Sequence, residues 1–122
     1  MGRLGTITSD DRPHVVPFVF AVDGETVYWA VDAKPKRSDR LKRLDNIRAN
    51  AAAEVVVDGY DEDWSRLWWI RASGRARVVD DAAERGQALR LLVDKYPQYA
   101  KVRPTGPVVA IDVARWSWWS AT

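Results

Sequence analysis

The chain has 122 residues, 47% of them hydrophobic and 30% charged, which predicts one globular domain over residues 1–122 with a sizeable core. It contains no cysteine, so disulfide scaffolds, cysteine nucleophiles and thiolate metal sites are excluded, and a reducing cytoplasm is the expected location. No apolar run approaches the ~18–20 residues that span a bilayer, and no signal peptide is visible, so no membrane partner is expected.

The first third of the chain predicts three strands, over residues 2–8, 14–22 and 26–32, from alternating apolar residues and a high β-branched and aromatic content. Pro17 has no N–H to donate, so the second strand should lie at a sheet edge or carry a bulge at this residue. Asp23-Gly24 is a two-residue hairpin signal between the second strand and the third.

A helix is predicted after Pro35, where apolar residues recur at helical spacing, at Leu41, Leu44 and Ile47. A different stripe of the same helix is basic, because the positions i, i+4 and i+7 are occupied by Lys36, Arg40 and Arg43. The predicted helix therefore has one face for a core and another for an anion or for solvent.

Three more strands are predicted in the second half of the chain, over residues 53–60, 67–79 and 108–119. A kink is expected near Gly74. Asp80-Asp81 can cap a second helix, which Pro97 ends. The element order is β-β-β-α-β-β-α-β with hairpin-joined neighbours, and it predicts a mainly β, antiparallel closed sheet rather than a doubly wound one.

Positive charge is concentrated in residues 34–48, where seven Lys and Arg face two Asp for a net charge of +5, which leaves the rest of the chain at −3. This distribution suggests a local anion site more than a general polyanion surface. Lys34 and Lys36 would lie at the helix N-terminus, where backbone N–H groups also attract a phosphate. A solvated helix face explains the composition equally well, so the residues alone leave both interpretations open.

Side chains suited to acid–base or nucleophilic catalysis are scarce. His14 is the single histidine, and the sequence has no G-x-S-x-G elbow, Walker loop or G-x-G-x-x-G motif. A transition-metal site usually needs more than one His or a Cys. We therefore expect no metal and no catalytic side chain, and we expect a cofactor to carry any reaction while the protein binds and orients it.

Seven tryptophans are unusual for this length, and two pairs of them are adjacent in predicted strands. The members of Trp68-Trp69, and those of Trp118-Trp119, should point to opposite faces of their strands. One face is expected to be the barrel core. The other face is then a dimer contact or a site for a flat-ring ligand, since bare aromatic patches are uncommon on monomers.

Four segments carry a resemblance to a known family: KPKRSDRLKRLDNIRAN from Lys34, VVVDGYDEDWSRLWWIRASGRARVV from Val55, KYPQY from Lys95 and RWSWWS from Arg115. Together they resemble the pyridoxamine-5′-phosphate-oxidase-like FMN-binding split-barrel proteins, over essentially the whole chain. The segment DEDWSRLWW is similar, more narrowly, to an actinobacterial subgroup of deazaflavin (coenzyme F-420)-dependent oxidoreductases.

The resemblance implies a six-stranded antiparallel split β-barrel with two helices, which forms a homodimer with the cofactor in grooves between the protomers. It implies that the cofactor phosphate is bound by five basic residues, namely Lys34, Lys36, Arg37, Arg40 and Arg43. The cofactor ring is expected against the second strand near Val16 and Pro17, largely through backbone groups.

The implied activity is hydride transfer between F-420 or a flavin such as FMN and a small organic substrate. Alternatives are an FMN-dependent oxidase or reductase, and a non-catalytic protein that binds a flavin, haem or tetrapyrrole. A nucleic-acid partner is not expected, because nucleic-acid surfaces usually show a broader positive field. Two departures from the family are Asn50-Ala51 in place of Asn-Pro, and a start close to the first strand without the usual preceding helix, which suggests a truncated or reduced N-terminus.

Overall fold

The computed structural model describes residues 1–31 and 37–122, without the side chains of residues 37–42. Within these residues the strands are β1 (Gly2–Ile7), β2 (Pro13–Phe18), β3 (Ala21–Asp23), β4 (Thr26–Ala30), β5 (Ala52–Gly59), β6 (Trp68–Val78) and β7 (Val108–Ser120). The helices are α1 (Arg37–Ala49), α2 (Ala82–Lys95) and α3 (Pro97–Lys101), with a 3₁₀ turn at Trp64–Arg66. None of these helices is long and apolar enough to cross a membrane.

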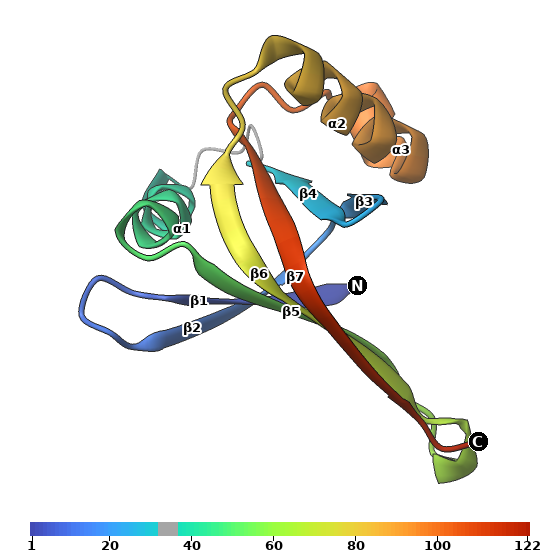
Figure 1. The fold of residues 1–122 in the computed structure, drawn as a ribbon. Helices are drawn as coiled ribbons and strands as arrows, with labels where there is room; N and C mark the ends of the chain where they lie inside the picture. Colours follow the sequence, from blue (N-terminus) through green and yellow to red (C-terminus); the bar gives the residue numbers. More distant parts are fainter. Residues whose placement is uncertain (32–36) are drawn as a thin grey trace.

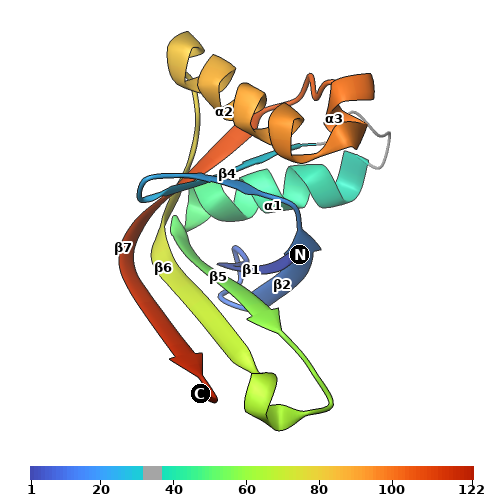
Figure 2. The same ribbon diagram turned by 90° about the vertical axis from the view of Figure 1, so that its right-hand side faces the viewer.

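The strands form one curled sheet in the order β2-β1-β5-β6-β7-β4-β3, and every neighbouring pair is antiparallel (Figure 1). Figure 2 shows α1 lying across the mouth of the curl, while α2 and α3 lie together beyond β4. The predicted mainly β, antiparallel fold is therefore confirmed. The described sheet has seven strands rather than six, and a third, short helix follows α2.

The additional strand arises because the predicted strand over residues 14–22 is divided at Val19 and Phe20. Phe20 donates its backbone N–H to the Tyr96 hydroxyl at 3.1 Å, and its carbonyl accepts from the same hydroxyl at 3.0 Å. The Lys95 ammonium also donates to that carbonyl, at 2.7 Å. The end of α2 thus takes the backbone groups that would otherwise continue the strand ladder.

Three local predictions are confirmed. β2, which contains Pro17, is an edge strand, where a residue without an N–H is tolerated. Asp81 caps α2, since its carboxylate accepts from the Glu84 N–H at 2.9 Å. The pairing of β6 with β7 shifts register between Ser73 and Gly74, which is the predicted irregularity.

The core lies between the curled sheet and α1. Trp29 and Leu4 are each 1% exposed there, and α1 contributes Leu44 and Ile47 to the same cluster. A second, smaller cluster on the outer face joins α2 to β4 and β7, and consists of Tyr28, Val79, Ala88, Leu89, Val108 and Ala110. The two clusters use opposite faces of β4 and β7, as the alternation of side chains in a strand requires.

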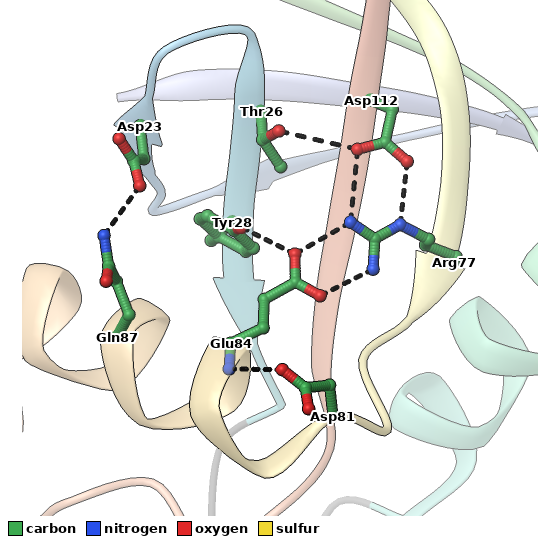
Figure 3. A network of polar contacts seen from close by, with 8 residues as sticks. All are labelled: Asp23, Thr26, Tyr28, Arg77, Asp81, Glu84, Gln87 and Asp112. Carbon is green, nitrogen blue, oxygen red and sulfur yellow. Dashed lines mark hydrogen bonds and ion pairs between the residues drawn. The ribbon is translucent and has the colours of Figure 1, made fainter.

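A polar network fastens α2 to the outer face of the sheet (Figure 3). Arg77 of β6 donates to the Glu84 carboxylate at 2.8 and 2.7 Å and to Asp112 at 2.7 and 3.2 Å. The Tyr28 hydroxyl donates to Glu84 at 2.7 Å. These hydrogen bonds, from Arg77 first and Tyr28 second, lower the pKa of Glu84 from 4.5 to about 2. Burial, followed by the hydrogen bond to Glu84, raises the pKa of Tyr28 to about 12.

Replacing Glu84 by Gln should lower the free energy of unfolding by about 1–2 kcal/mol at pH 7, because it weakens charge-assisted hydrogen bonds whose side chains are partly exposed. A carboxylate whose pKa is lower in the folded than in the unfolded protein stabilises the fold at pH values above its unfolded pKa. This stabilisation is lost as the pH falls towards the folded pKa. The difference between wild type and variant should therefore shrink between pH 4.5 and about pH 2. Urea unfolding at several pH values measures this difference in stability, and Glu62→Gln, at an exposed residue, is the control. A constant difference over this range would contradict the assignment.

Replacing Gly74 by Ala tests the irregularity in β6. A Cβ at Gly74 would collide with the backbone oxygen of Asp112, and backbone cannot move aside cheaply. We expect a loss of about 2 kcal/mol or more in the free energy of unfolding, as overpacking typically costs. Gly5→Ala in β1 is the matched control, because its Cβ would meet its nearest neighbour at an ordinary 3.7 Å. Equal effects of the two substitutions would contradict the prediction.

Candidate cofactor and ligand site

The predicted phosphate-binding residues are only partly described. Lys34 and Lys36 lie outside the described residues, and Arg37 and Arg40 lie in α1 with side chains that the structure does not describe. Their convergence on a phosphate therefore stays a prediction. Arg43 is the member of the set whose side chain can be placed.

Arg43 is half-buried and lies against the core (Figure 2 shows the position of α1). Its guanidinium carbon lies 5.9 Å from the centre of the Trp29 ring, a cation–π arrangement. Three buried nitrogen atoms here have no hydrogen-bond partner in the described part of the chain: Nε of Arg43, Nε1 of Trp29 and Nδ2 of Asn46. All three are N–H donors, so this part of α1 and β4 lacks acceptors and suits an oxygen-rich anion.

The two residues expected near the cofactor ring lie on opposite faces of β2. Val16 is paired with Leu4 and packs against the core. Pro17 is paired with Arg3, and both are exposed on the outer face. Because β2 is an edge strand, its backbone remains available for the expected contacts, and these also stay a prediction.

The tryptophan pairs differ from the prediction in one respect. Adjacent tryptophans do point to opposite faces, since Trp69 is paired with Trp119 and Ile70 with Trp118. However, the core-side members are not buried: Trp68 is 40% exposed and Trp118 is 73% exposed. The reason is that β5, β6 and β7 run beyond the core as a projecting arm, residues 57–71 and 116–120, which Figure 1 shows at the C-terminal end.

The outer face of this arm contains a cleft of about 510 Å³. Its floor consists of two cross-strand rows. One row crosses β1, β5 and β6 and consists of Arg3, Val56 and Arg71. The next row on the same face crosses β5, β6 and β7 and consists of Asp58, Trp69 and Trp119. The cleft is also lined by Gly59 at the end of β5, by Trp68 at the start of β6, and by Tyr60 and Leu67 in the connection between these strands.

The cleft has an unneutralised positive side. The Arg71 guanidinium carbon lies 5.5 Å from the centre of the Trp69 ring. Within the described part of the chain, the one hydrogen bond of the Arg3 side chain is long, 3.4 Å, to the carbonyl of Gly2. Among the described residues, no carboxylate lies within ion-pair distance of either guanidinium. The acidic lining residue is Asp58, beside Trp69 in the second row.

His14 lies on the other face of the sheet from this cleft. It is paired with Thr6, which is 5% exposed and faces the core side. Its Nδ1 is buried without a partner among the described residues. The same part of the chain holds no group of three or more His, Asp or Glu arranged for a metal ion.

Sequence reasoning did not identify the cleft. The cleft residues Arg3 and Arg71 are more than fifty residues apart in the sequence. Only strand pairing brings them into one row with Val56. The available signal was the alternation Trp69-Ile70-Arg71, which places an aromatic ring and a guanidinium on one face of β6.

A curled antiparallel sheet with a helix across its mouth defines this chain as a protein of the split-barrel class. The family model described as pyridoxamine 5′-phosphate oxidase matches residues 1–119, so the chain belongs to this family. No curated protein matches the sequence.

Several solved structures share the fold. A conserved hypothetical protein from Mycobacterium tuberculosis is 19% identical, with a TM-score of 0.79 over 98% of this chain and 76% of that one. A FAD-binding protein from Mesorhizobium loti is 21% identical, with a TM-score of 0.71 over 96% of this chain and 83% of that one. HutZ, the haem storage protein of Vibrio cholerae, is 11% identical, with a TM-score of 0.73 over 98% of this chain and 84% of that one.

Proposed function

We propose that this protein is an oxidoreductase that transfers a hydride between a bound deazaflavin (F-420) or flavin and a small organic substrate. The observation that carries the proposal is the contact between α1 and β4, where Arg43 and Asn46 of α1 and Trp29 of β4 have buried N–H groups without acceptors among the described residues. Arg43 and Asn46 belong to the basic segment of residues 34–48. Membership of the family and the fold shared with a FAD-binding protein support a cofactor of the flavin type.

In this proposal the chain binds and orients, and supplies no catalytic side chain. The cofactor phosphate is assigned to the side chains of Lys34, Lys36, Arg37, Arg40 and Arg43. Its ring is assigned to the exposed edge of β2 near Val16 and Pro17. A bound flavin or deazaflavin supplies the hydride chemistry itself. The protein's part is to hold the ring at the sheet edge and to compensate the phosphate charge.

We prefer F-420 to FMN because of the similarity carried by the DEDWSRLWW segment. The central residues of this segment form the 3₁₀ turn at Trp64–Arg66 in the arm. FMN is the alternative, for an oxidase or reductase.

Non-catalytic binding of a flavin, haem or tetrapyrrole is the second candidate function, since HutZ, which shares the fold, is described as a haem storage protein. His14 gives this candidate little support, because the single histidine faces the core side. A cytoplasmic location remains part of the proposal.

A homodimer is proposed from the core-side face of the arm. Four large apolar side chains project there from β6 and β7 and are between 36% and 73% exposed: Trp68, Ile70, Trp116 and Trp118. A patch of this kind is uncommon on a monomer. A second copy would cover it, and an obligate interface of roughly 2,000 Å² or more is expected.

Removing two cations from α1 tests the phosphate site. Arg40→Ala combined with Arg43→Ala should weaken affinity for F-420 or FMN by roughly a hundredfold, because each charge-assisted contact contributes about 1.5–3 kcal/mol. Arg48→Ala, an exposed residue in the last turn of the same helix, is the matched control and should bind normally. Fluorescence titration with each cofactor, after thermal melting has established folding, provides the measurement. Affinities within threefold of wild type would refute the phosphate site.

Placing a charge on the arm tests the homodimer. Sedimentation at tens of micromolar should find wild type as a dimer and Trp118→Glu as a monomer, because the variant buries a carboxylate in an apolar interface. Val102→Glu is the control, since Val102 is 66% exposed and ends α3, which Figure 1 shows at the opposite end of the molecule from the arm. Monomeric wild type, or a Trp118→Glu variant that dimerises like the control, would contradict the proposal.

A further inference from the structure

The second row of the cleft floor is suited to a flat ring. Trp69 and Trp119 are direct cross-strand partners on the outer face, and Trp119 remains 45% exposed. Tyr60, 75% exposed, lies at the end of the same cleft. The volume of about 510 Å³ falls within the range of about 300–1,000 Å³ that small-molecule sites occupy. Aromatic side chains around such a space favour an aromatic ligand.

The first row is suited to one anionic group. Arg3 and Arg71 flank Val56 on neighbouring strands, which places their Cα atoms about 10 Å apart at the usual strand spacing. Neither has an ion-pair partner among the described carboxylates, so both positive charges lack a counter-charge there, although the Arg71 guanidinium also lies over the Trp69 ring. A planar guanidinium matches the two oxygens of a carboxylate. This row lies about 7 Å along the strands from the tryptophan row, the length of two residues.

The acidic residue limits the charge of the ligand. Asp58 lies beside Trp69, in the row next to that of the two arginines. A second anionic group placed over the tryptophans would meet this carboxylate at close range, and like charges there repel. The cleft therefore favours a ligand with an apolar ring at one end and a single negative charge at the other.

We propose that the outer cleft of the arm binds a planar aromatic monocarboxylate. Its ring lies on Trp69 and Trp119, and its carboxylate lies between Arg3 and Arg71. The binding itself is independent of the function proposed above. That this ligand is the substrate or product of hydride transfer rests on that function.

Calorimetry with 2-naphthoate, and with 2-naphthol as the uncharged analogue, tests the site. Wild type should bind naphthoate the more tightly. Arg3→Gln combined with Arg71→Gln should weaken naphthoate binding about tenfold or more and leave naphthol binding unchanged. Arg12→Gln combined with Arg90→Gln removes the same charge from exposed positions outside the cleft and should have no effect.

Trp119→Ala tests the contact with the aromatic ring independently of the charge, because this variant should bind both 2-naphthoate and 2-naphthol more weakly than wild type. Equal binding of the two probes by wild type, or equal behaviour of the two double variants, would overturn the site. Displacement of naphthoate by FMN or F-420 in direct competition would assign the cleft to the cofactor and overturn the proposal. Naphthoate binding by a protein that takes up neither cofactor would uphold the cleft and refute the proposed oxidoreductase instead.

Discussion

β6 is hydrogen-bonded to β7 along its whole length, from Trp68 to Val78, and this ladder connects α2, the core and the cleft. At one end Arg77 fixes α2 through Glu84 (Figure 3). In the middle, Ala72 faces the core. At the other end Trp69 helps to form the floor of the cleft. The register shift at Gly74 lets one continuous strand serve both the closed part of the sheet and the projecting arm.

The two candidate ligand surfaces lie on opposite sides of the sheet. α1, with Arg43 over Trp29, closes the core side, whereas Arg3 and Arg71 point outward. Within one copy the sheet separates these surfaces, so each suits a different ligand. Hydride transfer needs the reacting atoms of cofactor and substrate in contact, so the proposed reaction would take place where the cleft reaches the β2 edge, at Arg3 and its partner Pro17. The exposed arm offers a further, third surface, on which a second copy is proposed to pack.

Much of the local structure was predictable because short-range chemistry decides it. Asp81 caps a helix through its own carboxylate, and Pro17 is confined to an edge strand by its missing N–H. The division of the second predicted strand was not predictable. It depends on the hydroxyl of Tyr96, which reaches Phe20 from seventy-six residues away in the chain. Arg43 was identified as part of a basic stripe, but its contact with Trp29 depends on how α1 packs across the sheet.

The sequence by itself determined that the chain forms antiparallel strands, where its two longer helices lie, and that neighbouring tryptophans point to opposite faces, because these follow from residue type and from the periods of strand and helix. Only the tertiary structure decided how far the core extends along β6 and β7, and hence that Trp68 and Trp118 are exposed. It also decided that Arg3 and Arg71 share a row. Register between strands distant in sequence is set by packing the whole sheet, and no local pattern encodes it.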